Sequence, residues 1–360
     1  MTRGLTALFV LGTGLFAQPA PPGGAQPTTA ILANDKLELT IGLTGARFLR
    51  LLLRDGEPLS PLATMGHFLA LDGFGAPSSE ERVAGMPMHG EANRIAAQVI
   101  AARESGPVRS VILQMSLPLA QETLTRTVEL ADGENIVYVT SELESALAVD
   151  RPVSWAEHAT LGPPYLEPGK ITIDMPATRC RVRAEKAGST GRLAYLQDFD
   201  WPMAPLAKGG TVSLLTVPVG ETSLDLASCL MNPSRTYEYV TALRPDKQLL
   251  FGYVFRREDY PWLMSWMNYS GDARAARGIE FSTQPFDVSH RETVDAHEMF
   301  GAPTYKWLPA KSKIRTRFLF FYTKTPADFT GVADVVLEDG QVKIKDNSGK
   351  TVALNARLGL

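Results

Sequence analysis

Apolar and polar residues alternate at period two along much of this chain, and that pattern predicts half-buried β-strands. Residues 36–41 (KLELTI) and 123–130 (TLTRTVEL) are clear cases. In the second segment Leu124, Arg126, Val128 and Leu130 share one face. Asp-Gly pairs at 55–56 and 132–133 are strong turn signals, and consecutive strands with tight turns predict an antiparallel meander. Further strands are expected at 46–54, 108–117, 135–143, 171–175, 211–217, 236–243, 249–255, 262–268 and 314–322.

Helical signals are weak by comparison. No amphipathic segment of ten or more residues stands out, and the two short candidates are residues 225–232 and 289–300. Residues 58–87 are irregular and are expected to form a long loop with strand fragments. The sequence therefore predicts an all-β protein. We expect one large antiparallel β-sandwich domain over residues 30–325, with a C-terminal β-hairpin extension of the same domain at 326–360.

Composition agrees with a folded domain and narrows the partners. Hydrophobic residues make up 44% of the chain and charged residues 21%, with a formal net charge of −3 and both signs scattered. These values exclude bulk disorder, and the absence of a basic block argues against nucleic-acid binding. The 30 glycines and 25 prolines favour many short strands joined by turns over long helices.

The N-terminal residues have the pattern of an export signal. Arg3 precedes an apolar run at 4–16, and small residues follow it. We interpret 1–20 as a signal peptide and 21–29 as a linker, which predicts a periplasmic or secreted protein with no membrane span once the signal is removed. The run is short for a membrane span, which needs about 20 apolar residues. The alternative is a buried N-terminal helix, which the prolines and glycines at 19–24 would break.

The chain has two cysteines, Cys180 and Cys229. They could pair in an oxidising compartment or remain two buried thiols, and we favour the unpaired state. No CxxC and no cysteine–histidine spacing suits zinc, and the histidines at 290 and 297 lack a HExxH arrangement. The sequence therefore predicts neither a metal site nor an organic cofactor.

Three short polar interruptions carry the candidate chemistry. His89 lies in GMPMHGEA (85–92), His158 in WAEHATLG (155–162) and Glu280 in RGIEFSTQP (277–285). Taken singly, a loop histidine, a core histidine bonded to a backbone carbonyl and an outward glutamate explain them equally well. Our hypothesis is that the three meet in one groove and act on a sugar. Trp155 and Trp266 are candidates for stacking on a sugar face, with core packing as the alternative for each.

These segments resemble the aldose 1-epimerase (galactose mutarotase-like) superfamily, in its divergent bacterial branch, over about residues 30–325. The markers are HFL (67–69), GMPMHGEA (85–92), residues 155–169, DWP (200–202), GIE (278–280) and TQP (283–285). The resemblance implies a galactose mutarotase-like β-supersandwich and an enzyme that interconverts sugar anomers by opening and reclosing the pyranose ring. It implies no cofactor.

The resemblance also implies roles for single residues. Glu280 matches the base that removes the anomeric proton, His158 the acid that protonates the ring oxygen, and His89 the histidine that holds and polarises the sugar. A buried carboxylate nearby would favour the protonated imidazole. No arginine matches the sugar-binding arginine of the family, and His67 and Arg82 are the candidate substitutes.

Departures from the family pattern define the alternative function. Glu91 stands where the usual mutarotases have a second glycine, and Glu157 stands where they have an asparagine. These changes would also suit a non-catalytic carbohydrate-binding protein on the same fold. A polysaccharide lyase or hydrolase is a third possibility, because fold alone does not fix chemistry. The partner expected in each case is a hexose or related carbohydrate. The sequence predicts neither the sugar nor the oligomeric state.

Overall fold

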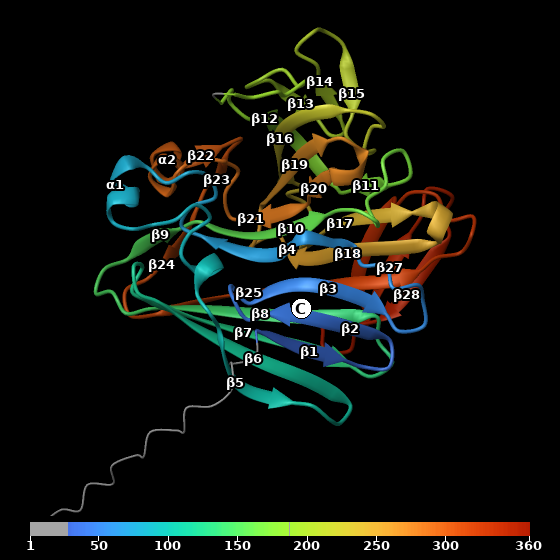
Figure 1. Ribbon diagram of the computed structural model, residues 1–360, viewed down its shortest axis with the longest axis horizontal. Coiled ribbons are helices and arrows are strands. Elements are labelled where there is room, and N and C mark those ends of the chain that lie inside the picture. Colours follow the sequence, from blue (N-terminus) through green and yellow to red (C-terminus); the bar gives the residue numbers. More distant parts are fainter. Residues whose placement is uncertain (1–27, 187) are drawn as a thin grey trace, which may run out of the picture.

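Two large antiparallel sheets packed face to face form the body of the protein (Figure 1). A computed structural model describes residues 28–186 and 188–360. Within them, one sheet has eleven strands and the other has eight. The apolar residues of both inner faces form one continuous core between the sheets. This arrangement confirms the predicted all-β sandwich, because period-two alternation gives each strand one face for that core.

The strands of the larger sheet follow in spatial order. They are β1 (Thr29–Ala33), β2 (Leu37–Gly42), β3 (Arg47–Leu53), β4 (Leu62–Leu71), β10 (Trp155–Leu161), the collinear pair β20 (Ala276–Gly278) and β21 (Glu280–Ser282), β19 (Trp262–Ser270), β16 (Thr222–Met231), β12 (Ala177–Val182) and β13 (Asp198–Asp200). Strand β10 therefore lies near the middle, between β4 and the β20–β21 pair.

The smaller sheet contains the predicted meander. Its order is β11 (Thr172–Asp174), β17 (Tyr237–Arg244), β18 (Leu249–Arg256), β25 (Lys313–Lys324), β8 (Ile136–Ser145), β7 (Glu122–Ala131), β6 (Val108–Leu117) and β5 (Gln98–Arg103). Buried and half-buried residues alternate along β7, as its sequence predicts. Arg126 on the apolar face of β7 is buried with the core residues.

Residues 326–360 form a small three-stranded sheet of β26 (Asp334–Glu338), β27 (Gln341–Lys345) and β28 (Thr351–Asn355). Val335, Val342 and Ile344 pack on the outer face of the eight-stranded sheet, against residues such as Leu250 and Leu319. The expected hairpin is thus a meander with a second apolar cluster of its own.

The remaining elements are short. They are α1 (Ser79–Val83), α2 (His290–Ala296), three 3₁₀ turns (Ala92–Arg94, Pro245–Lys247 and Asp272–Arg274) and the strand pairs β9 (Arg151–Val153) with β24 (Lys306–Leu308), β14 (Met203–Pro205) with β15 (Thr211–Ser213), and β22 (Glu298–Met299) with β23 (Ala302–Pro303). Both helices begin with a capping box, Ser78 with Glu81 and Ser289 with Glu292. They lie side by side near the ends of the central strands β4 and β10 (Figure 1), where Arg291 N donates to Glu81 Oε1.

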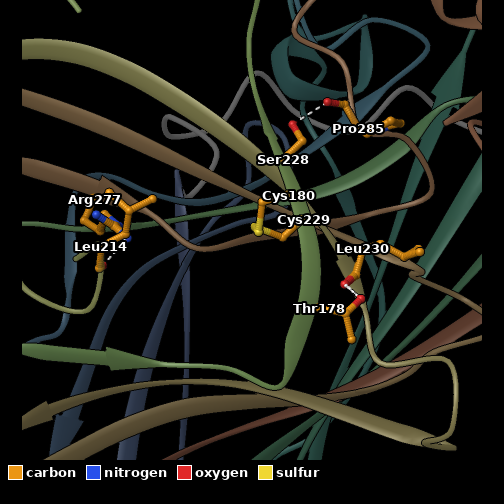
Figure 2. Close-up of a disulfide and its surroundings, with 8 residues drawn as sticks. All are labelled: Thr178, Cys180, Leu214, Ser228, Cys229, Leu230, Arg277 and Pro285. Carbon is orange, nitrogen blue, oxygen red and sulfur yellow. Dashed lines mark hydrogen bonds between the residues drawn. A yellow bond between two sulfur atoms is a disulfide. The ribbon is translucent and has the colours of Figure 1, made fainter. Parts of the chain in front are cut away.

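Three sequence expectations are corrected. Residues 225–232, a short helix candidate, contain no helix, and 225–231 belong to β16. Residues 62–71, expected within a long loop with strand fragments, form the continuous ten-residue strand β4. Cys180 and Cys229, expected as free thiols, form a disulfide (Figure 2). The two cysteines are direct cross-strand partners on β12 and β16, which brings their Cα atoms to 4.0 Å.

The disulfide lies in a well-connected part of the sheet edge (Figure 2). Thr178 Oγ1 donates to the Leu230 carbonyl at 3.1 Å, and Ser228 Oγ donates to the Pro285 carbonyl. The second bond links β16 to the loop after β21. The predicted signal peptide and most of the predicted linker lie outside the described residues. In the described part of the chain, no helix is both long and apolar enough to cross a membrane.

Candidate functional site

One row of side chains crosses the outer face of the eleven-stranded sheet. Phe68 on β4 pairs with His158 on β10, and Glu280 on β21 pairs with Met264 on β19. The registers of β10 with β20 and β21 place Glu280 directly across from His158. Directly opposed cross-strand side chains on one face have Cβ atoms about 4.5–5.5 Å apart. The sheet therefore fixes the His158–Glu280 pair by backbone register.

Alternation sends the neighbours of these residues to the other face. Phe281, next to Glu280, and Trp155 and Ala159 on β10 belong to the core between the sheets. The outer face would be solvent-facing in a bare sheet, yet Glu280 is fully buried and His158 is 4% exposed. Loops from other parts of the chain cover this face, so the row becomes the floor of a cavity.

The cavity has a volume of about 560 Å³, which is enough for a small ligand. It is lined by Met65, Phe74, Ala76, Met88, His89, His158, Arg183, Lys186, Leu224, Leu226, Trp266, Asn268, Glu280 and Asp287. The covering segments are joined to one another: Gly75 N donates to the Val288 carbonyl at 2.9 Å. A Cβ at position 75 would lie 2.6 Å from Val288 N, so glycine permits this close approach.

The reacting geometry centres on His158 and Glu280. His158 Nε2 lies 3.4 Å from Glu280 Oε1, and His158 Nδ1 lies 3.2 Å from Thr160 Oγ1. The His158 ring stacks on Phe68, with ring centroids 4.2 Å apart. Neither oxygen of Glu280 has a hydrogen-bond partner, although both are buried. Unpaired buried polar atoms are rare in folded proteins and call for a partner such as a ligand or water.

Burial shifts both groups toward their neutral forms. It raises the pKa of Glu280 well above its usual value, and the Asp287 charge adds to that shift. It lowers the pKa of His158 well below 6.5, and His89 adds to that effect. The expectation that a nearby carboxylate would favour a protonated imidazole is therefore not met. Burial favours a carboxylic acid at Glu280 and a neutral ring at His158.

Gly278 makes room for the Glu280 carboxyl group. A Cβ at position 278 would lie 2.0 Å from Glu280 Oε1 and 2.9 Å from Trp266 Cβ. The Glu280 side chain therefore folds back over the backbone of β20. Gly278, two residues before Glu280, is therefore required for the space that it leaves to the carboxyl group and not for backbone flexibility.

His89 reaches the cavity from a strained loop. Its φ is +66°, and the following Gly90 has φ +75°. A Cβ at position 90 would lie 1.6 Å from the Leu71 carbonyl oxygen, so only glycine brings this loop against the end of β4. The His89 ring meets the His158 ring edge-on at 5.4 Å, and its buried Nδ1 has no partner. Burial lowers the pKa of His89.

Comparison with solved structures decides the fold. A galactose mutarotase-like protein from Clostridium acetobutylicum matches with a TM-score of 0.58 at 12% identity, covering 82% of this chain and 95% of that one. A galactose mutarotase-like protein from Lactobacillus casei gives 0.54 at 15%, covering 82% and 100%. A Klebsiella pneumoniae protein provisionally assigned as an aldose 1-epimerase gives 0.60 at 14%, covering 84% and 82%.

This chain has the galactose mutarotase-like fold. No protein-family model matches the chain, and no curated protein matches it either. At these identities the likeness establishes the fold alone. The chemistry of the site therefore has to be argued from its own side chains.

The galactose mutarotase-like fold brings only some of the predicted site residues together. His89, His158, Glu280 and Trp266 line the cavity. Arg82 does not: it is exposed on α1 and donates to the Pro77 carbonyl at 3.4 Å. Trp155 is fully buried between the sheets, where its Nε1 donates to Glu157 Oε1 at 3.1 Å. Trp155 therefore follows the core-packing alternative.

His67 is also corrected, because alternation places it on the face opposite Phe68. It is fully buried between the sheets, where its Nε2 lies 2.8 Å from Glu157 Oε2 and its Nδ1 lies 3.0 Å from the Tyr253 hydroxyl. Arg126 Nη2 donates to Glu157 Oε1 at 2.6 Å. Burial alone would raise the pKa of Glu157, but the Arg126 charge and the hydrogen bonds outweigh it and lower that pKa to about 2. Glu157, which departs from the family pattern and was expected near the sugar, instead holds β10 in place from the core side of the sheet.

Sequence reasoning missed three charged residues of the cavity, namely Arg183, Lys186 and Asp287. Arg183 Nη1 lies 3.2 Å and Lys186 Nζ 2.8 Å from Asp287 Oδ2. Asp287 follows the TQP marker by two residues, which was a usable signal, whereas Arg183 and Lys186 lie in an irregular segment with no pattern. Among the described residues, no group of three or more His, Cys, Asp or Glu side chains could hold a metal ion.

Proposed function

We propose that this protein is an aldose 1-epimerase-like enzyme that interconverts the anomers of a sugar. The observation that carries the proposal is the His158–Glu280 pair, with Nε2 and Oε1 3.4 Å apart on the floor of the cavity. Mutarotation moves protons at two oxygens that share one carbon, the anomeric hydroxyl and the ring oxygen. An acid and a base that serve both must lie close together on one side of the sugar, as these two groups do.

The reaction balances without any external reagent. One group of the pair removes the proton of the anomeric hydroxyl while the other donates a proton to the ring oxygen. The bond between the anomeric carbon and the ring oxygen breaks, and a carbonyl forms. The C1–C2 bond rotates, and the same two groups reverse the steps on the other face. The pair holds one proton at the start and one at the end.

Either direction of proton flow uses the same pair. The family resemblance assigns Glu280 as the base and His158 as the acid. Burial raises the pKa of Glu280 and lowers that of His158, so that assignment requires the proton to pass from Glu280 to His158 when the sugar binds. The 3.4 Å separation allows such a transfer, and the bound sugar's hydroxyls would supply the polar partners that ionised Glu280 lacks.

The other walls suit a pyranose. Trp266 lies on β19, beside Glu280, and its partly exposed ring offers an apolar face to a sugar ring. Phe74 and Phe68 close the side next to His158. His89 Nδ1 and the Glu280 oxygens are buried and unpartnered, so sugar hydroxyls would satisfy them.

The test is exchange spectroscopy by proton NMR on sugars at anomeric equilibrium, with the mature protein and with a protein-free sample for the spontaneous rate. We expect faster exchange with the protein and loss of that gain in Glu280→Gln. Glu258→Gln, at an exposed surface pair with Arg256, is the matched control. Binding of a sugar with no gain in exchange would favour the carbohydrate-binding alternative, and full activity in Glu280→Gln would overturn the role of Glu280.

We also propose that the protein is exported. The N-terminal pattern and the Cys180–Cys229 disulfide support this, because structural disulfides persist mainly in oxidising compartments. Expression of the full chain in a Gram-negative host, followed by fractionation and intact-mass measurement, should recover a periplasmic protein cleaved near residue 20. An unprocessed chain in the cytoplasm would contradict the proposal.

A further inference from the structure

The wall of the cavity away from His158 is cationic. Arg183 and Lys186 line it together with Asp287. Among the residues that the structure describes, Asp287 is the one carboxylate in direct contact with either cation, and it pairs with both. The Lys186 charge also lowers the pKa of Glu292, the capping carboxylate of α2, but it is the smallest of the effects on that pKa. Two cations and the one carboxylate that they share therefore give this wall a net positive charge.

Arg183 has donor capacity that the protein does not use. Its side chain is 9% exposed. Its Nη2 donates to the Leu224 carbonyl at 3.0 Å and its Nη1 to Asp287, but its buried Nε has no acceptor. A guanidinium presents its donors in a planar fork that matches carboxylates and phosphates. Lys186, by contrast, is 40% exposed, so solvent reaches it more readily than it reaches Arg183.

The distance between the two ends of the cavity fits one substituted pyranose. Glu280 lies on β21, which pairs with β19, and β19 pairs with β16. Arg183 bonds to the backbone of β16 through Leu224 and Leu226. The floor from Glu280 to the Arg183 wall thus spans two strand spacings, about 9–10 Å. Trp266, on the strand between them, lies where the ring of the sugar would rest.

We propose that the sugar carries a negatively charged group, a carboxylate or a phosphate, at the end away from its anomeric carbon, and that Arg183 and Lys186 bind that group. This inference rests on the proposed anomer exchange for the direction in which the sugar lies. An anion there would accept from Arg183 Nε and share the charge of Lys186, while the anomeric carbon meets His158 and Glu280.

A purely structural ion cluster is the competing explanation. In that case Arg183 and Lys186 only hold their segment against residue 287. The two explanations differ in sign for Asp287→Asn, which removes the competing carboxylate. If the cations bind substrate, this change strengthens the binding of anionic sugars, whereas a structural role predicts no gain for any ligand.

The experiment measures affinity by calorimetry and anomer exchange by NMR for three probes: glucose, glucuronate and glucose 6-phosphate. Spontaneous exchange of each probe is subtracted. The variants are Arg183→Gln, Lys186→Gln and Asp287→Asn, with Lys208→Gln at an exposed turn as the charge-matched control. Lys186 is the more exposed of the two cations, so Lys186→Gln keeps the test valid if Arg183→Gln folds poorly. Comparison of the two anionic probes separates a carboxylate from a phosphate.

We expect an anionic probe to bind at least about tenfold more tightly than glucose, since charge-assisted hydrogen bonds are the strong class. We expect Lys186→Gln or Arg183→Gln to remove most of that preference and Lys208→Gln to keep it. Glucose bound and exchanged as well as both anions, with no effect of either cation variant, would overturn the inference and leave the epimerase proposal intact. Tight binding of an anionic probe without anomer exchange would support the anion site and overturn the epimerase proposal. No binding of either anion would also overturn the inference.

Discussion

Gly278→Ala tests the geometry on which the proposed chemistry depends. The new Cβ would lie 2.0 Å from Glu280 Oε1. Ordinary van der Waals contact begins at 3.4 Å, so the carboxyl group has to move by about 1.4 Å. Trp266 Cβ, 2.9 Å away on the other side, resists a shift of the new methyl group in that direction. A misplacement of about 1 Å can cost about 100-fold in rate, and we expect a loss of that order in kcat/KM.

The assay is anomer exchange by NMR on the substrate that the wild-type protein turns over, with thermal unfolding measured in parallel. The φ of Gly278 is not left-handed, so alanine does not strain the backbone and the fold should persist. Gly56→Ala, also at a position without a left-handed φ but far from the cavity, is the control. In a Glu280→Gln background the alanine should add little further loss. Wild-type activity in Gly278→Ala would refute the placement of the Glu280 carboxyl group.

Three further predictions concern stability. Gly90→Ala should destabilise the protein by about 3 kcal/mol or more, measured by chemical unfolding, because its Cβ would lie 1.6 Å from the Leu71 carbonyl oxygen. Glu157→Gln should cost about 3–5 kcal/mol by leaving its arginine partner buried without a counter-charge. Because folding lowers the pKa of Glu157 to about 2, its ionised form stabilises the folded state at any pH above the usual pKa of a glutamate. This contribution is lost as the pH falls toward 2, and the free-energy cost of Glu157→Gln decreases with it. Cys180→Ala with Cys229→Ala should cost about 4 kcal/mol in guanidinium unfolding, since the bond closes a loop of 49 residues. A loss under about 1 kcal/mol in any of the three would contradict the assigned contact.

The sequence predicts strands well wherever one face of the strand is buried and the other half-buried. Strand β7 is such a case, and even its buried Arg126 follows the pattern. Strand β4 was missed because most of its side chains with a described environment are buried on both faces, so that alternation disappears. The part of β16 within 225–232 was missed for a similar reason, since residues 225–229 are buried on both faces and the sequence shows no period-two alternation there.

The candidate site was predictable only where residues follow strand periodicity or a family marker. His158 and Glu280 follow strand periodicity and also belong to family markers. His67 was wrongly assigned to the site: it is next to Phe68 on β4, so its side chain must lie on the opposite face of the strand. Arg183 and Lys186 come from an irregular segment, and only tertiary structure carries them to the cavity. The cysteine pairing depended on the register of β12 with β16, which no local pattern contains.

Strand β10 has a practical consequence for directed evolution. All seven of its residues are buried, with His158 on one face and the Glu157 network on the other. A mutation library over this strand would consist mostly of unfolded clones, because no position in it is free of packing on either side. Diversity is better placed at Lys186 and Asp287, whose side chains line the cavity and do not belong to the core between the sheets. Selection for new sugars can then proceed on one wall while the reacting pair is inherited unchanged.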